Sequence, residues 1–282
     1  EFLACNILAV NTVFAIVVVF FERRSPKSVW AWLLLLYFLP IVGFLLYLLL
    51  GMDLHKRKLF RVKEVADSVQ EAARKQEHSL KSMDLEQLEA HLETYRELIV
   101  YNLRAGNAVL TGDNDVDIFT DGNQLFDSIL QDLEQAKWFI HIQFYIIKND
   151  VLFERIREVL ARKAAEGVEV RFMYDDMGCV ALLPYKYYKK LEEYGIKCVA
   201  FNPVIPFFSL VMNHRDHRKI TVIDGNVGFM GGWNLADEYI NKVQKYGHWK
   251  DTAIMLKGEA VKSLTLMFLQ MWNVDEKKPE FD

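Results

Sequence analysis

The sequence predicts an α/β protein in which a layered sheet flanked by helices follows two apolar segments and a charged helical linker. Three observations lead to this fold class. Two long runs near the amino terminus carry no charge, the next stretch is highly charged and lacks glycine and proline, and the remainder alternates β-rich with amphipathic runs. We therefore divide the chain into an apolar hairpin at 1–52, a helical linker at 53–106 and an α/β part at 107–282.

Composition excludes several classes of function. The 282 residues are 52% hydrophobic with a formal net charge of -4, which does not steer nucleic-acid binding. Cys5, Cys179 and Cys198 lie far apart, so they predict neither a disulfide framework nor a zinc site and favour a reducing compartment. The chain starts at Glu1 inside an apolar run, without an initiator methionine, and we expect it to be a fragment.

The two apolar segments, 2–21 and 29–50, predict a membrane hairpin. Each reaches the length of about 20 apolar residues that a helix needs to cross a bilayer. A signal peptide is the alternative for the first segment, and a buried core helix for either, although long core helices usually carry a polar face. Pro40 and Gly43 interrupt the second segment, so the pair either spans the bilayer with a bend or dips into one leaflet.

Basic residues leave the orientation of this hairpin open. The loop between the segments carries Arg23, Arg24 and Lys27, and a larger basic cluster lies at 56–63. The larger cluster favours a cytoplasmic location for everything after residue 51. A true two-span hairpin would then place the loop's three basic residues outside, a conflict that a shallow hairpin removes. The same cluster is also suited to holding anionic lipid headgroups.

The charged linker carries one apolar stripe at helical spacing, which comprises Leu85, Leu88, Leu92, Tyr95 and Ile99. The stripe indicates either a partner-binding helix or a connector that packs on its own domain. We favour the connector, because the stripe is too short for a coiled coil.

The α/β part begins after Asn107 and reads as alternating strands and helices. Gly167 and Gly195 each follow a helical run, as glycine commonly does at a helix end. The expected strands are 116–121, 137–147, 168–176 and 196–201, and the expected helices are 122–136, 151–166 and 184–195.

The next strand, "DHRKITVID" at 216–224, carries the strongest chemical signal. Alternation places His217, Lys219 and Thr221 on one face. Asp224 ends the strand at an Asp-Gly tight turn, and "NVGFMGG" returns as another strand. A histidine beside a lysine suits phosphate chemistry, because the lysine neutralises phosphate oxygens while the histidine attacks phosphorus or moves a proton. Gly231 and Gly232 would allow close approach of a ligand, and Asn234 adds an amide donor.

A single His-x-Lys pair is usually a solvated strand edge, but this one belongs to a longer pattern. The pattern H-x-K-x4-D-x6-G-G-x-N resembles the phospholipase D superfamily motif without departure, and its members are His217, Lys219, Asp224, Gly231, Gly232 and Asn234. The resemblance implies that the histidine forms a phosphohistidine or protonates the leaving group. It also implies that the lysine and the asparagine hold the phosphate, and that no metal or other cofactor is required.

The resemblance extends over nearly the whole chain to the bacterial cardiolipin synthase family. It is carried by "ERRSP", "LPIVGFLLYLLLG", "HRKITVIDG", "GGWNLADEY" and "HWKDTAIMLKGEAV". It implies phosphatidyl transfer at the bacterial cell membrane, with a cytoplasmic catalytic domain. One phosphatidylglycerol is attacked, glycerol leaves, and the hydroxyl of a second phosphatidylglycerol accepts the phosphatidyl group.

One departure from that family concerns the number of motifs. Such synthases carry two motifs on two pseudo-symmetric halves, whereas this chain carries one and ends at Asp282. We therefore expect a missing second half or a second copy of the chain as a partner. Two alternatives stay open: another phosphodiesterase of the superfamily, either phospholipase or nuclease, and a non-enzymatic membrane scaffold, which would have no reason to retain Lys219 and Asn234 beside His217.

Four further residues have two interpretations each. His214 and Arg215 precede the motif strand and either meet a lipid headgroup or lie in a surface loop. His141, in an interior strand, is better interpreted as a core histidine than as a site residue. Tyr145 lies at the far end of the same strand, near the expected cleft. A role in the site and a purely structural role are both open for it.

Several acids complete the candidates. Asp175 and Asp176 end a strand, where they either orient a site group or cap a turn. Asp237 and Glu238 follow the motif and suit the start of a helix. Asp251 is the preferred carboxylate for hydrogen-bonding the His217 ring and fixing its tautomer, and the alternative is a surface charge.

Overall fold

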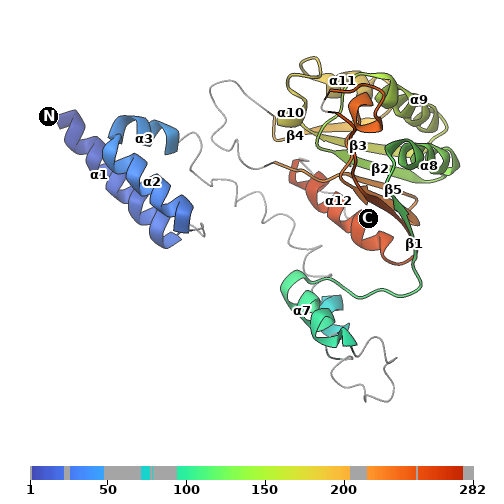
Figure 1. Cartoon of the computed structure of the whole chain (residues 1–282), viewed down its shortest axis with the longest axis horizontal. Coiled ribbons are helices and arrows are strands. Elements are labelled where there is room, and N and C mark those ends of the chain that lie inside the picture. Colours follow the sequence, from blue (N-terminus) through green and yellow to red (C-terminus); the bar gives the residue numbers. More distant parts are fainter. Residues whose placement is uncertain are drawn as a thin grey trace. The chain divides into compact units, whose positions relative to one another are not determined.

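The computed structural model describes residues 2–21, 26–47, 71–76, 78, 94–203, 215–245 and 247–275. The chain divides into two compact units, one built on the amino-terminal helices and one that contains the sheet (Figure 1). Each unit is described separately below.

The amino-terminal unit contains four helical elements: α1 (Phe2–Ile16), η1 (Val17–Phe21), α2 (Pro26–Phe38) and α3 (Pro40–Leu46). Val18, Leu36 and Tyr47 form its buried core. The predicted interruption at Pro40 is confirmed, because α2 ends at Phe38 and α3 begins at the proline. None of the helices in the described ranges combines the length and the apolarity that crossing a bilayer requires.

Asn11 supports the break between α2 and α3. Pro40 has no N–H, so the carbonyl of Leu36 lacks its usual helical donor. The Asn11 side-chain amide donates to that carbonyl at 3.1 Å and to the carbonyl of Pro40 at 2.9 Å. A Cβ on Gly43 would lie 2.5 Å from the carbonyl oxygen of Leu35, so only glycine fits where α3 folds back against α2.

Most of the predicted linker stripe lies outside the described residues, because Leu85, Leu88 and Leu92 belong to that part. Helix α7 (Arg96–Gly106) is described, and it ends at Asn107 in the left-handed region. Ile99 packs against a small cluster of Ala73 and Leu103, which also belong to the linker, whereas the Tyr95 side chain is exposed.

The second unit is built on a seven-stranded mixed sheet in the order β1-β7-β6-β5-β2-β3-β4, which confirms the predicted layered α/β class. Strands β2, β3 and β4 are parallel to one another, and the remaining pairs are antiparallel. The strand bounds are β1 Asp115–Phe119, β2 Phe139–Phe144, β3 Glu169–Asp175, β4 Lys197–Phe201, β5 Ile220–Ile223, β6 Val227–Gly231 and β7 Ala253–Lys257.

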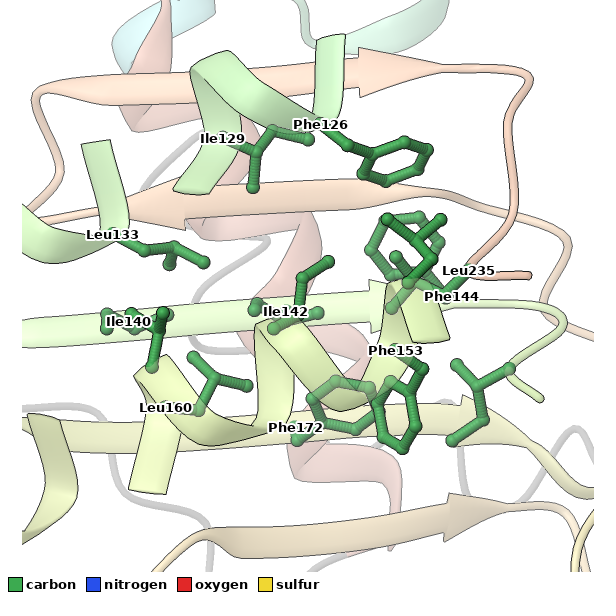
Figure 2. Close-up of a cluster of buried hydrophobic side chains, with 14 of the residues drawn as sticks. Phe126, Ile129, Leu133, Ile140, Ile142, Phe144, Phe153, Leu160, Phe172 and Leu235 are labelled. Carbon is green, nitrogen blue, oxygen red and sulfur yellow. The ribbon is translucent and has the colours of Figure 1, made fainter. Parts of the chain in front are cut away.

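Helices cover both faces of the sheet (Figure 1). Asp121 and Asp150 are the N-caps of α8 and α9, and each side chain accepts a backbone N–H of the first turn. In Figure 2, apolar side chains of these two helices pack on Ile140, Ile142 and Phe144 of β2. The helix bounds are α8 Gly122–Gln135, α9 Val151–Ala165, α10 Asp176–Cys179, α11 Tyr187–Glu192, η5 Asp237–Ile240 and α12 Val261–Asp275.

The opposite face of β2 carries His141, which is buried as the sequence indicates. Its ring stacks on Phe268 of α12 at a centroid distance of 4.5 Å and lies 4.6 Å from the ring of Phe139. Burial, together with the nearby charge of Arg171, lowers the pKa of His141 to about 3. Its Nδ1 atom has no hydrogen-bond partner among the residues that the structure describes, so the imidazole is neutral and serves as an apolar packing group.

We predict that His141 makes the chain sensitive to acid. The folded-state pKa lies below the ordinary value of 6.5, so protonation favours the unfolded state. The contribution of the neutral His141 ring to the free energy of unfolding is complete above pH 6.5. As the pH falls from there toward 3, about 1.4 kcal/mol of it is lost for each pH unit. His141→Phe should flatten the decline in melting temperature over that window, as followed by circular dichroism. The same substitution at exposed His248 is the control, and equal curves for the two variants would contradict the assignment.

Candidate active site

His217 and Lys219 lie at the end of the sheet where the parallel strands β2 and β3 finish and β5 begins. Strand β5 starts at Ile220 rather than at residue 216, so His217 and Lys219 precede the strand in irregular structure. The reason is that the backbone N–H of Asp216 donates to the carboxylate of Asp175 at 3.0 Å. The ends of parallel strands are the usual place for a binding site in an α/β sheet.

Lys219 and His217 are in direct contact. The Lys219 ammonium lies 3.1 Å from each ring nitrogen of His217 and donates to the His217 carbonyl oxygen at 2.7 Å. Lys219 is only 5% exposed, whereas the His217 side chain is open to solvent. The pair therefore presents a reachable imidazole beside a buried cation.

Burial sets the protonation of both groups. It lowers the pKa of Lys219 to about 8, and the negative charges of Asp251 and Asp216 act in the opposite direction. Burial and the charge of Lys219 lower the pKa of His217, while Asp175 and Asp216 oppose that change. Near neutral pH the arrangement thus favours a neutral imidazole with an available lone pair beside a charged lysine.

Tyr145 lies against this pair, so the structure places it at the site. Its ring centroid is 4.6 Å from that of His217, and the Lys219 ammonium is 5.4 Å from the tyrosine ring. The segment that follows β3 is packed tightly on the tyrosine backbone, because a Cβ on Gly178 would lie 2.2 Å from the Tyr145 carbonyl oxygen.

Asp175 anchors the backbone immediately before His217. Its side chain is buried and accepts from the backbone N–H groups of Asp216, Met177 and Gly178, so it also caps α10.

The charge of Asp175 is balanced by Arg215. The guanidinium of Arg215 lies 3.5 Å from the Asp175 carboxylate and donates to the Asn202 carbonyl. Burial raises the pKa of Asp175, and these donors partly oppose the rise. Asp175 therefore caps α10, as one of its two interpretations predicts, and it also holds the backbone beside His217.

Asp216 and Gln143 complete this support, and the sequence interpretation missed both. The Asp216 carboxylate accepts from the side-chain amide of Gln143 and from the backbone N–H of Arg218. Gln143 lies on β2 and is buried together with Asp216. A polar residue that interrupts an apolar strand beside a motif is the signal that was available.

Asn234 presents its amide nitrogen for a ligand. Its Oδ1 accepts the backbone N–H of Ile146 at 2.9 Å, which fixes the side chain in its buried position. Its Nδ2 makes no hydrogen bond to the described part of the chain. The remaining N–H donors suit an anionic oxygen.

The double glycine requires a correction, because protein rather than ligand occupies the space beside it. A Cβ on Gly231 would lie 2.4 Å from the Cβ of Ala253 on the neighbouring strand β7. A Cβ on Gly232 would lie 2.1 Å from a carboxylate oxygen of Asp251. These glycines therefore allow β7 and Asp251 to approach β6.

Asp251 also differs from its predicted role. Both Asp251 and His217 are described, and no hydrogen bond joins the carboxylate to the ring. Asp251 instead accepts the backbone N–H of Thr252 at 2.8 Å and acts on the site through its charge near Lys219. The carboxylates that act on His217 electrostatically are Asp175 and Asp216.

Asp224 is a structural member of the motif rather than a reacting group. Its carboxylate accepts the backbone N–H groups of Lys137, Trp138 and Phe139 at 2.8–2.9 Å. It occupies the left-handed region at φ 52°, in the turn after β5 and thus at the other end of that strand from His217. The predicted tight turn is confirmed, but the catalytic placement of Asp224 is corrected to an anchor between β5 and β2.

The remaining candidates lie away from the His217 ring or outside the described residues. Asp237 begins η5 and accepts the backbone N–H of Leu152 at 2.9 Å, and Glu238 pairs with Lys148 at 3.1 Å. Asp176 is the first residue of α10. His214 lies outside the described part. Within the described ranges, no group of three or more acidic, histidine or cysteine side chains is arranged to hold a metal ion.

Comparisons with known proteins agree with the motif. A family model described as "Cardiolipin synthase, PLD-like domain" matches residues 129–272, and one described as "Phospholipase_D-nuclease N-terminal" matches residues 10–51. The chain is 43% identical over 265 residues to cardiolipin synthase 2 of Staphylococcus epidermidis, a match that covers 93% of this chain and 54% of that protein. Cardiolipin synthase of Staphylococcus aureus is 42% identical, with coverage of 93% and 53%.

The chain spans about half the length of the curated relatives that it matches. Among solved structures, NucT from Helicobacter pylori matches 57% of this chain and 98% of its own, at 14% identity and a TM-score of 0.45.

Proposed function

The chain belongs to the phospholipase D-like cardiolipin synthase family, and from this membership we propose that it carries one catalytic half of a phosphatidyltransferase. The proposed reaction joins two phosphatidylglycerol molecules into cardiolipin and releases glycerol. The observation that supports this assignment most strongly is the contact between the reachable His217 imidazole and the buried Lys219 ammonium. Anionic phospholipid is thus the proposed substrate, and no cofactor enters the proposal.

In the proposed first step, a neutral ring nitrogen of His217 attacks the phosphorus of phosphatidylglycerol. A bond from nitrogen to phosphorus forms, the bond from phosphorus to the glycerol oxygen breaks, and that oxygen leaves with a proton. The hydroxyl of a second phosphatidylglycerol then attacks phosphorus, loses its proton and frees the histidine. Splitting the exchange in this way lets the protein hold the phosphatidyl group while glycerol departs.

Lys219 and Asn234 would stabilise charge on the phosphoryl oxygens during both steps. A phosphate oxygen would replace the His217 ring as the acceptor of a Lys219 N–H, which frees the ring nitrogen to attack. The Asn234 amide is held in place by the Ile146 backbone, so its donors need little reorganisation. We assign the proton transfers to a second histidine, supplied by a second catalytic half or by a second copy of this chain.

The proposed location is the cytoplasmic face of a bacterial cell membrane. The apolar helices α1, α2 and α3 would hold the protein at the bilayer, and we propose that residues 1–52 act as a membrane hairpin, 53–106 as a linker and 107–282 as the catalytic part. Sedimentation with vesicles after a high-salt wash tests the association. Recovery of the chain in the supernatant would contradict it.

Lipid product analysis tests the reaction itself. The full-length protein, incubated with labelled phosphatidylglycerol, should form cardiolipin and glycerol in equal amounts. Phosphatidic acid and glycerol would instead identify a phospholipase, and an absence of lipid conversion would favour a scaffold. Each of these two outcomes would overturn the proposal.

We predict that Asp175 positions His217 for this chemistry. In Asp175→Asn, one carboxylate oxygen becomes an amide nitrogen, which cannot accept an N–H, and Arg215 loses its anionic partner. Displacement of the backbone before His217 should lower kcat by about 10²-fold with little change in KM. Asp175 raises the pKa of His217, so its loss should also move the acidic limb of the rate profile to lower pH.

The neighbouring Asp176→Asn is the matched control, because Asp176 is not among the charges that shift His217. A fall in rate with an unmoved acidic limb would mean that Asp175 supports only the local fold.

A further inference from the structure

The segment between β3 and β4 carries a tip at residues 180–186 that is exposed except at the half-buried Leu182 and Leu183, and both of its ends are anchored to the sheet edge. At the first end, the Cys179 thiol is buried, lies 3.6 Å from the Tyr145 carbonyl and accepts the backbone N–H of Ile147 at 3.3 Å. At the second end, buried Tyr187 donates from its hydroxyl to the side chain of Asn149 at 3.0 Å. The tip is thus fastened at both ends to the segment 145–149.

These anchors place the tip beside the candidate active site. Tyr145 is in contact with the ring of His217, and Gly178, two residues before the tip, packs on the Tyr145 backbone. Asp175, three residues before Gly178, bonds to the backbone adjoining His217. A membrane or protein surface bound to the tip would therefore lie close to the His217 ring, the group proposed to attack phosphorus.

The tip and the helix after it combine exposed apolar side chains with positive charge. Val180 is 55% exposed and Tyr185 is 85% exposed. Lys186, Lys189 and Lys190 are all exposed, and no acidic residue occurs from 177 to 191. Lys190 lies near the Glu154 carboxylate of α9, and Glu192 ends α11, so Lys186 and Lys189 supply most of the positive charge beside the tip. The Lys186 ammonium lies 5.0 Å from the ring of Tyr185, so the cation and the ring point into the same region.

We propose that this tip, with the lysines of α11, is a docking surface for an anionic phospholipid bilayer. Tyrosine suits the boundary between lipid and water, because its ring is apolar and its hydroxyl stays wet. Lysines extend their charged ends toward headgroups while their stems lie on apolar surface. An interfacial lysine strengthens binding to an anionic leaflet by roughly fivefold. The inference rests on the proposed function, because phosphatidyl transfer at His217 requires lipid to reach this residue, and this surface would deliver it.

An environment-sensitive fluorophore tests the surface directly. We would attach it at Tyr185→Cys in the full chain carrying Cys5→Ser, because Cys179 and Cys198 are buried. With vesicles of phosphatidylglycerol and phosphatidylcholine, we expect a blue-shifted emission that spin-labelled lipid quenches. The matched control is the same label at exposed Asn226, in the turn at the opposite edge of the sheet, which should show neither effect. Equal responses at the two positions would overturn the proposal.

A charge variant gives a second readout on the labelled chain. Replacement of Lys186, Lys189 and Lys190 by glutamine should reduce quenching at position 185, and vesicles of phosphatidylcholine alone should do the same. Glutamine at exposed Lys137, Lys257 and Lys262 is the control and should leave the signal unchanged. Undiminished quenching in the first variant would contradict a role for anionic lipid.

Substrate turnover is measured separately with the full-length protein, which includes the proposed second catalytic half, as glycerol released from dispersed short-chain phosphatidylglycerol. An absence of release would count against the proposed function and would leave the fluorescence result as it stands. Release combined with an unresponsive label would count against the docking surface alone.

Discussion

Replacement of His217 by alanine in the full-length protein is expected to abolish phosphatidyl transfer while leaving the fold intact. The imidazole is exposed and lies against Lys219 and Tyr145 rather than within the core, so its removal leaves no core cavity. Without a ring nitrogen no covalent intermediate forms, and loss of a nucleophile in other enzymes lowers kcat by roughly 10⁴- to 10⁶-fold. Cardiolipin formation from labelled phosphatidylglycerol measures the first effect, and circular dichroism measures the second.

The control variant is His78→Ala, which removes an exposed histidine from the linker and should retain full activity. Trapping the labelled phosphatidyl adduct and mapping it by mass spectrometry then assigns the role. An adduct on His217 would support the assignment of His217 as the nucleophile. An adduct found only on a histidine of the second half would reduce His217 to the acid that protonates glycerol, and residual transfer near the normal rate would remove it from the mechanism.

The fold was largely predictable because its signals are local. Alternating β-rich and amphipathic runs gave the layered class, and Asp-Gly gave the turn after β5. The start of β5 was not predictable, because its first expected residue, Asp216, gives its backbone N–H to Asp175, which lies 41 positions earlier. The break at Pro40 was predictable from the proline itself, but the compensating hydrogen bonds from Asn11, which lies on another helix, were not.

The candidate site was predictable as a set of residue types but only partly as a geometry. The spacing of His217 and Lys219 predicted that they would lie side by side, although they meet in irregular structure before β5 rather than on a strand. The partners of Asp251 and of the two glycines depend on how closely β6 and β7 approach, which spacing does not encode. Gln143 could have been identified because it interrupts an apolar strand, whereas its partner Asp216 lies in a charged stretch and does not differ in the sequence from a solvated side chain.

Lys219→Ala is expected to lower the rate of transfer by roughly two to three orders of magnitude, because one donor aimed at developing charge is worth about 3–4 kcal/mol. The wild-type rate should also fall as pH rises through about 8, since burial lowers the pKa of Lys219 to that value and only the charged form stabilises phosphoryl oxygens. The sign follows from the group, because raising the pH removes the proton from the lysine. A pH–rate profile of the full-length protein measures this limb.

Lys219→Arg separates charge from geometry. A guanidinium stays protonated throughout the accessible range, so the alkaline limb near pH 8 should disappear even though the longer, planar group lowers the maximal rate. Lys219 is buried and donates to the His217 carbonyl, so a larger guanidinium does not fit its place well. We therefore expect the rate of the arginine variant to stay below the wild-type rate at neutral pH. If the limb near pH 8 persisted in Lys219→Arg, the titrating group would be another one, and the charge of Lys219 would not account for the alkaline loss of activity.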